Sequence, residues 1–156
     1  MGKSYKEKLR LQRKWAARQY ERQRRHNLVY AKPGVHQFVI ILDNLKPSYN
    51  IGKIFRSADG FGAREVHLIG IDYFECKSAK GSFKWVPARY HDSFASCYHA
   101  LRDDGYSFFT LEPKDSEQLH QASLPLKSGF VFGHEEYGLS FDPADFKDIH
   151  PLSIPQ

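Results

Sequence analysis

The chain has 156 residues, enough for one domain with a short extension, and its 41% hydrophobic and 15% aromatic content is sufficient for a core. No stretch approaches the roughly 20 uninterrupted apolar residues of a membrane helix. No apolar stretch follows the charged N-terminus either, as a secretory signal would require. We therefore expect a soluble, cytoplasmic protein that has no membrane partner.

The net charge of +5 is concentrated at the N-terminus. Residues 1–25 carry ten lysines and arginines against Glu7 and Glu21, a net of +8, and the remainder is mildly acidic. The composition favours a helix to about residue 26. A linker follows over 26–34, where Pro33 and Gly34 would break any helix. A positive arm on an acidic body suits a polyanion, with nucleic acid first. A merely solvated helix is the alternative, and a membrane-surface helix is the weaker one because apolar residues are few and scattered.

Beyond the linker, the apolar run 37–42 predicts a strand buried on both faces, as in a parallel sheet. Apolar residues then recur every three or four positions from 51 to 61, which predicts a helix with Asn50 as its N-cap. Residues 65–69 predict a second strand. These three segments form a strand-helix-strand unit of plausible length.

The rest of the chain continues the alternation of strands and helices. We predict strands at 83–90, 106–111 and 129–132, a helix at 93–102, a short helix around 118–121, and the start of one more strand at 152–154. This order indicates an α/β fold with an open, mostly parallel sheet and helices on both faces. Ligands are expected at the carboxyl ends of its strands.

Two loops that follow predicted buried strands carry residues suited to chemistry. In the first, Asn50 is either a simple helix cap or part of a site, and Arg56 is either a solvated helix residue or a rigid cation that grips a phosphate or ribose. In the second, Gly133 and Gly138 allow the backbone to approach a ligand closely, and Glu135 lies between them.

Several other kinds of site lack their sequence patterns. The second loop is no HExxH zinc motif, and the chain contains no GxGxxG, no GxxxxGK[ST] and no GxSxG. The sequence therefore does not favour a nicotinamide-binding site, an ATP-binding site or an acyl-transfer enzyme. Cys76 and Cys97 form no CxxC, and the remaining histidines show no spacing typical of metal ligands, so we predict reduced, partly buried thiols and no metal site.

Together the two loops resemble the SpoU family of the SPOUT superfamily. The resemblance covers roughly residues 36–156 and rests on three segments: Asn50-Ile-Gly52 with Arg56-Ser-Ala58 and Phe61-Gly-Ala63, then Phe132-Gly133 with Glu135 and Gly138-Leu139, then Ile154-Pro155. It implies a SPOUT fold with a deep C-terminal knot, an exception to un-knotted topology. It also implies transfer of a methyl group from S-adenosylmethionine to a ribose 2′-hydroxyl of tRNA or rRNA.

The resemblance divides the chain into a basic helical RNA-binding extension and linker (1–34) and a methyltransferase domain (35–156). In the family the third segment continues into a Ser-Leu-Asn stretch and a long final helix, which do not follow Pro155 here. The resemblance therefore implies a C-terminally incomplete domain, with the knot and the cofactor pocket affected. Two alternatives are a catalytically inactive RNA-binding relative and an unrelated nucleotide-binding α/β domain, and the missing phosphate loops argue against the second.

The resemblance also assigns roles to individual residues. Arg56 would act at the ribose, Asn50 would help to build that pocket, and Glu135 would support its geometry. The expected cofactor-binding residues are Leu111, Gly133, His134, Gly138, Ile154, Pro155 and Gln156. The expected RNA-binding residues are Lys6, Arg10, Arg13, Lys14, Arg18, Arg22, Arg24 and Arg25. The family further implies a homodimer, in which Arg56 serves the cofactor of the other subunit.

Overall fold

A computed structural model of the chain describes residues 2–113 and 115–155. Its helices are α1 (Tyr5–Tyr30), α2 (Tyr49–Gly60) and α3 (Phe94–Asp103), and four short 3-10 turns are η1 (Cys76–Ala79), η2 (Ser82–Lys84), η3 (Leu119–Gln121) and η4 (Pro143–Asp145). Its strands are β1 (Val39–Asp43), β2 (Val66–Ile69), β3 (Ala88–His91), β4 (Ser107–Leu111), β5 (Glu117–Gln118), β6 (Ser128–Phe132) and β7 (Ile149–Ser153). None of the helices within these residues is long and apolar enough to cross a membrane.

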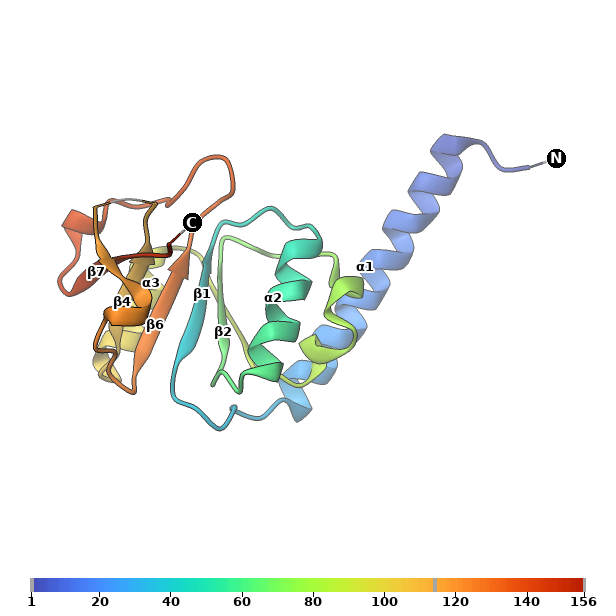
Figure 1. The fold of residues 1–156 in the computed structure, drawn as a ribbon. Coiled ribbons are helices and arrows are strands. Elements are labelled where there is room, and N and C mark those ends of the chain that lie inside the picture. Colours follow the sequence, from blue (N-terminus) through green and yellow to red (C-terminus); the bar gives the residue numbers. More distant parts are fainter. Residues whose placement is uncertain (1, 114, 156) are drawn as a thin grey trace.

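The seven strands form one sheet in the order β3-β2-β1-β6-β4-β7-β5, and every pairing in it is parallel. Strand β1 lies in the interior, between β2 and β6 (Figure 1). This position explains the uninterrupted apolar run in its sequence, because a parallel strand is covered on both faces. The predicted α/β class with an open parallel sheet is confirmed.

Alternate residues of the central strands pack on opposite faces of the sheet. Leu42 and Leu68 belong to a core that includes α2 and the turns η1 and η2, whereas Ile41 and Ile69 belong to a second core with α3. The two cores lie on the two sides of the sheet, with α2 and α3 in different layers (Figure 1). The prediction of helices on both faces is confirmed.

Ser4 precedes helix α1, and its hydroxyl caps the Glu7 amide; the N-terminal part of the helix extends away from the body (Figure 1). The helix docks through the buried residues Ala16, Tyr20 and Asn27, from its middle to its C-terminal end. The Asn27 amide donates to the carbonyls of Phe83 (2.7 Å) and Val86 (2.5 Å), and its oxygen accepts from the Ala88 amide (3.2 Å).

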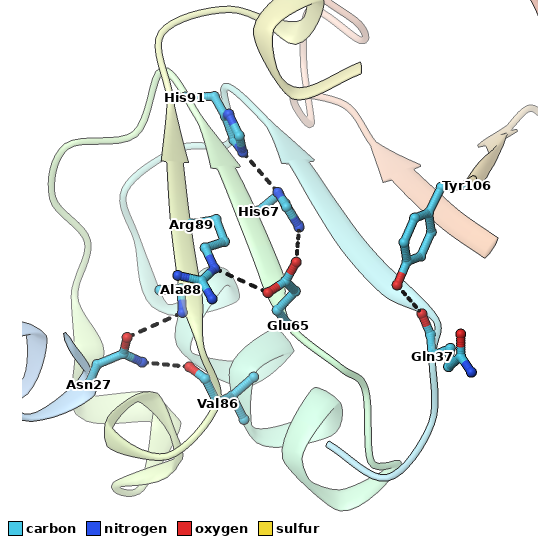
Figure 2. Close-up of polar contacts among 9 residues, drawn as sticks. All are labelled: Asn27, Gln37, Glu65, His67, Val86, Ala88, Arg89, His91 and Tyr106. Atoms are coloured by element: carbon cyan, nitrogen blue, oxygen red, sulfur yellow. Dashed lines mark hydrogen bonds and ion pairs between the residues drawn. The ribbon is translucent and has the colours of Figure 1, made fainter. Parts of the chain in front are cut away.

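The prediction that the helix ends near residue 26 was therefore wrong. The helix continues to Tyr30, and the segment expected to be linker begins as helix. The physical reason is tertiary: Asn27 projects from this part of the helix and satisfies three backbone groups of the body, two of which, at Val86 and Ala88, are drawn in Figure 2.

The predicted strand at 83–90 was wrong over its first half. Residues Ser82–Lys84 form the turn η2, and the strand is limited to Ala88–His91. Phe83 is buried in an aromatic cluster with Phe55 (5.1 Å between ring centroids) and Phe74 (4.7 Å). Packing into this cluster turns the chain away from the sheet, and Pro87 lacks an N–H that a ladder would use.

The other predicted boundaries of helices and strands differ less from the observed ones. The short helix predicted around 118–121 is a single 3-10 turn that follows the two-residue strand β5. The strand predicted at 152–154 begins earlier, at Ile149, where it pairs with Phe108 of β4. Both cysteines are buried and free, as predicted.

Candidate functional site

The candidate site lies at the topological switch point of the sheet, where the order of the strands reverses. From β1 the chain proceeds to β2 and β3 on one side, and the later strands β6, β4 and β7 lie on the other side. Leu42 at the end of β1 is paired with Phe132 at the end of β6. The loops that follow these two strands therefore meet at the carboxyl edge of the sheet, the position at which open α/β sheets bind ligands.

Asp43, the last residue of β1, holds these two loops together through hydrogen bonds. Its carboxylate is fully buried and accepts hydrogen bonds from the Ser140 amide (2.6 Å), the Ser140 hydroxyl (2.7 Å) and the Asn44 side chain (2.7 Å). Charge-assisted bonds of this kind are strong when desolvated. The sequence motifs did not predict this role of Asp43, although a carboxylate that ends a buried apolar strand is a detectable signal.

The glycines of the second loop are required by its geometry. His134 and Gly138 exchange backbone hydrogen bonds (2.8 and 2.9 Å), and Gly138 has a φ of 70°, which favours glycine. A Cβ on Gly133 would lie 2.6 Å from the carbonyl carbon of Gly138. The two glycines therefore permit a tight turn that presents residues 135–137 at the edge of the sheet.

Glu135 connects this turn to the start of α2. Its carboxylate accepts from the Asn50 side-chain amide (3.3 Å) and from the Lys46 backbone amide (3.5 Å). Desolvation by itself would raise the pKa of Glu135, but hydrogen bonds from its own amide, Asn50 and Lys46 lower it below its ordinary value. Glu135 is therefore a carboxylate that two parts of the chain hold in place.

Of the two interpretations of Asn50, the simple helix cap was wrong. Helix α2 begins at Tyr49, two residues earlier than a cap at Asn50 would require, and Ser48 occupies the cap position without a side-chain capping bond. Asn50 lies in the first turn, and its amide is directed to Glu135 instead. The tertiary contact with a residue 85 positions away replaces the local capping bond.

Gly52, in the same motif, allows α2 to pack closely against η1. A Cβ at this position would meet the Ala79 amide nitrogen at 2.8 Å and the Ser78 hydroxyl more closely still. The Ser78 hydroxyl in turn donates to the Tyr49 carbonyl (2.6 Å). The Asn-Ile-Gly pattern thus combines a residue that faces the site with a glycine that positions its helix.

A hollow of about 330 Å³ lies beside the Asn50–Glu135 contact. Its lining consists of Leu45, Asn50, Lys53, Ile54, Ser57, Phe132, Gly133 and Glu135. Arg56 is exposed and lies in a neighbouring hollow, which shares Lys53 and Ser57 with the first. The structure thus brings Asn50, Gly133 and Glu135 together and places Arg56 beside them.

Lys53 is a site residue that the sequence analysis missed. It lines both hollows, one helical turn after Asn50 and one before Arg56. Residues three apart share a helix face, so the spacing of Asn50, Lys53 and Arg56 was the available signal.

The residues predicted to bind a cofactor lie at the ends of three adjacent strands. Leu111 ends β4, Gly133 follows β6, and Ile154 and Pro155 follow β7, which pairs with β4. His134 lies in the same loop, and its backbone amide and carbonyl are both bonded to Gly138. Gln156, the last predicted cofactor residue, lies outside the described residues.

The predicted RNA-binding side chains on α1 divide into two groups. Arg24 is half-buried, and its guanidinium lies 5.1 Å from the centroid of the Tyr90 ring, so it contributes to docking the helix. The others are exposed: Lys6, Arg10, Arg13, Lys14, Arg18, Arg22 and Arg25. The exposed group forms a positive surface on the part of α1 that faces solvent.

Comparisons with known proteins agree with this geometry. A model of the SpoU rRNA Methylase family matches residues 37–156. The chain is similar to the tRNA (guanosine(18)-2'-O)-methyltransferase of Thermus thermophilus, with 26% identity over 106 residues, which are 65% of this chain and 54% of that protein. The chain spans about half the length, or less, of the curated relatives it matches first.

Solved structures share the fold. The TrmH/SpoU tRNA modifying enzyme of A. aeolicus aligns with a TM-score of 0.68 at 21% identity, over 87% of this chain and 71% of that one. The AdoMet-bound rRNA methyltransferase of Sinorhizobium meliloti aligns with a TM-score of 0.67 at 22% identity, over 84% of this chain and 51% of that one. At these identities the likeness establishes the fold, which is that of these methyltransferases.

Proposed function

This chain belongs to the SpoU rRNA methylase family, and on that premise we propose that it transfers a methyl group from S-adenosylmethionine to a ribose 2′-hydroxyl of tRNA or rRNA. The observation that carries the proposal is the contact between Asn50 and Glu135 at the junction of the β1 and β6 loops, beside a hollow that Gly133 also lines. The relative from T. thermophilus is named for this reaction on tRNA.

The residues at the carboxyl edge fit the proposed cofactor. Leu111 and Ile154 offer apolar contact at the ends of neighbouring strands, and Gly133 permits the tight turn of the loop beside them. With Pro155 they would hold the cofactor across the ends of β4, β6 and β7. When bound, S-adenosylmethionine supplies an activated methyl group on a positively charged sulfur.

Positioning is the main task of the protein in such a transfer. The leaving thioether is neutral and needs no acid, so alignment of the 2′-oxygen with the methyl group dominates the barrier. Glu135, fixed by Asn50 and Lys46, would keep the β6 loop in the geometry that this alignment needs. Asn50 would act as a wall of the ribose pocket.

Arg56 would stabilise the charge that develops on the 2′-oxygen. A guanidinium remains protonated at all relevant pH values, so it is suited to hold an anion and the adjacent phosphate rather than to remove a proton. Lys53, between Asn50 and Arg56 on α2, would add a second cation to the same surface. A requirement for a 2′-hydroxyl also selects RNA over DNA.

The proposed RNA-binding extension is α1. Its exposed lysines and arginines would contact phosphates, and the salt dependence of RNA affinity would report how many do so. Helix α1 docks at its C-terminal half, so the positive surface has a defined direction relative to the site. Action on tRNA or rRNA is consistent with the cytoplasmic location that we propose.

The proposed homodimer has a candidate surface next to the site. A largely apolar hollow of about 520 Å³ is lined by Phe38, Ile40, Ile54, Ala58, Phe61 and Phe132, with His36 and Ser57. Phe61 is 75% exposed. A second copy covering this surface would bring its own cofactor close to Arg56, and sedimentation equilibrium of the wild type against Phe61→Ser tests this association.

Two measurements on the same protein test the proposed reaction. Calorimetric titration with S-adenosylmethionine reports cofactor binding, and transfer of labelled methyl to bulk tRNA and rRNA, followed by nuclease digestion, reports 2′-O-methylation. We expect Arg56→Ala to retain cofactor affinity and to lose methylation by about 100-fold or more. Arg64→Ala is the matched control, because Arg64 lies before β2 at the opposite edge of the sheet.

Unchanged methylation by Arg56→Ala would dismiss the role of this residue. RNA binding without any methylation by the wild type would favour the inactive RNA-binding relative instead. Failure of the wild type to bind S-adenosylmethionine would remove the proposed reaction altogether.

A further inference from the structure

Three potential metal ligands converge on the side of the sheet that α3 covers, away from the proposed methyl-transfer site. His67 lies in β2, His91 ends β3, and Cys97 lies in α3. Nδ1 of His67 is 2.8 Å from Nε2 of His91, and one ligand atom of each of the three residues lies within 4.8 Å of the others. Figure 2 shows the two imidazoles directed toward each other from neighbouring strands.

The orientation of His67 is set by a carboxylate. Its Nε2 is 2.9 Å from Glu65, and the other oxygen of Glu65 accepts from the Arg89 guanidinium at 3.1 Å (Figure 2). The carboxylate holds the ring with Nδ1 toward His91. Histidines that bind metals almost always have such a partner on their second nitrogen, because it fixes the tautomer and the ring orientation.

We propose that His67, His91 and Cys97 form a binding site for a single Zn²⁺ ion. Two imidazoles and a thiolate are a donor set that zinc prefers, with water as the fourth ligand on the side of the half-buried His91. Two nitrogens bound to a tetrahedral zinc are roughly 3.3 Å apart at bond lengths of about 2.05 Å. The two nitrogens would need to separate by about half an ångström, and the rings would need to turn so that both lone pairs point at the ion.

The charges of the site also suit a divalent cation. Cys97 is fully buried and His67 nearly so, which makes uncompensated charge costly there. The thiolate of Cys97 would offset part of the charge of the ion, and the carboxylate of Glu65, which is shared with Arg89, would offset a further part. Coordination requires a thiolate, so binding releases the thiol proton of Cys97 to solvent.

A hydrogen bond between two neutral histidines explains the positions of the two rings without a metal. It does not explain why the thiol of Cys97 faces them. Cys76, the other buried cysteine, lies in η1 and is not part of any such group among the described residues. A bound ion would join α3, which packs on the sheet through apolar contacts, to the hydrogen-bonded pair of strands β2 and β3. The site is therefore structural, and it does not depend on the proposed methyl transfer.

Metal binding to the full chain tests the proposal directly. Protein freed of metal with a chelator is titrated with Co²⁺ alone, and we expect a thiolate-to-cobalt charge-transfer band that saturates at one ion per chain. Zn²⁺ should then displace the cobalt and raise the melting temperature. Cys97→Ser should abolish the charge-transfer band, whereas the matched control Cys76→Ser should retain it.

Three further variants, one of them a control, keep the result interpretable if Cys97→Ser folds poorly. His91→Gln, at a half-buried position, should lower zinc affinity by at least 100-fold, and His99→Gln on the exposed side of α3 should not change it. Glu65→Gln should weaken binding by 10- to 100-fold, as expected for a partner of a ligand. The proposal is overturned if the wild type binds no stoichiometric metal, or if binding survives both Cys97→Ser and His91→Gln.

Discussion

The side-chain amide of Asn50 donates a hydrogen bond to Glu135 at 3.3 Å and so joins the first turn of α2 to the loop after β6. Both residues line the hollow that also contains Gly133 and Lys53. The contact fixes the relative position of two loops that come from distant parts of the sequence. Its value to the proposed reaction is geometric, since neither side chain needs to exchange a proton.

Asn50→Ala should therefore lower methylation on the order of 100-fold, because a misplacement of about 1 Å in a positioned site has that effect. The melting temperature should change little, since both side chains are exposed. Transfer of labelled methyl to bulk RNA, with a parallel thermal melt, measures the two effects. Asp59→Ala, an exposed change on the same helix, is the control, and equal rates for the two variants would contradict the prediction.

The same contact should be visible in the titration of Glu135. Hydrogen bonds from its own amide, Asn50 and Lys46 outweigh desolvation and lower its pKa. Because the pKa is lowered, the contact contributes fully to the stability of the folded state at pH values above the ordinary pKa of a glutamate. This contribution is lost as the pH falls through the lowered pKa. NMR titration of the side-chain carboxyl should show the pKa of Glu135 rising toward its ordinary value in Asn50→Ala. An unchanged pKa would show that Asn50 does not bond to it in solution.

Asp43→Ala should destabilise the protein through the β6 loop. The buried carboxylate accepts from the amide and the hydroxyl of Ser140, and its removal deprives these donors and the Asn44 amide of their acceptor. We expect a loss of about 1–3 kcal/mol in the free energy of unfolding. Urea denaturation measures it, with the exposed Asp72→Ala as control. Protease cleavage within residues 133–140 should increase in Asp43→Ala alone.

Gly52→Ala and Gly60→Ala should have opposite effects, although both glycines are in α2. A Cβ on Gly52 would collide with the backbone of η1, whereas a Cβ on Gly60 would meet nothing within 4 Å. Gly52→Ala should cost about 1–3 kcal/mol through overpacking. Gly60→Ala should be neutral or stabilising by up to about 1 kcal/mol, because it restricts the unfolded chain. Denaturation curves of the two variants measure their free energies of unfolding. Equal values would contradict the close packing of α2 on η1.

Asn27→Ala should loosen α1 from the body. Its side chain satisfies the carbonyls of Phe83 and Val86 and the amide of Ala88, all in a buried position. The unfolding free energy should fall by about 1–3 kcal/mol. Hydrogen exchange of the amides in α1 should accelerate. Leu28→Ala, next to it but 66% exposed, should leave both quantities nearly unchanged, and similar effects of the two changes would refute the docking role of Asn27.

The parts of the fold that were predicted correctly have a local signature. The uninterrupted apolar run of β1, the helical periodicity of α2 and the glycines after β6 follow from the pattern of residues alone, because burial on both faces, one apolar helix face and tight turns each need particular residue types. The end of α1 and the segment at Phe83 were misread because their structure depends on partners far along the chain.

Composition and local periodicity are enough to indicate the α/β class, the two loops that carry Asn50 and Glu135, and the positive charge of the N-terminal helix. Which residues come into contact is set by the tertiary fold. Parallel pairing places Leu42 beside Phe132, so that Asp43 holds Ser140 and Asn50 faces Glu135 instead of capping its helix. It also brings His67, His91 and Cys97 together, although their spacing along the chain predicted no metal site. Contacts between neighbouring strands are set by the order of strands in the sheet, and linear spacing does not contain that order.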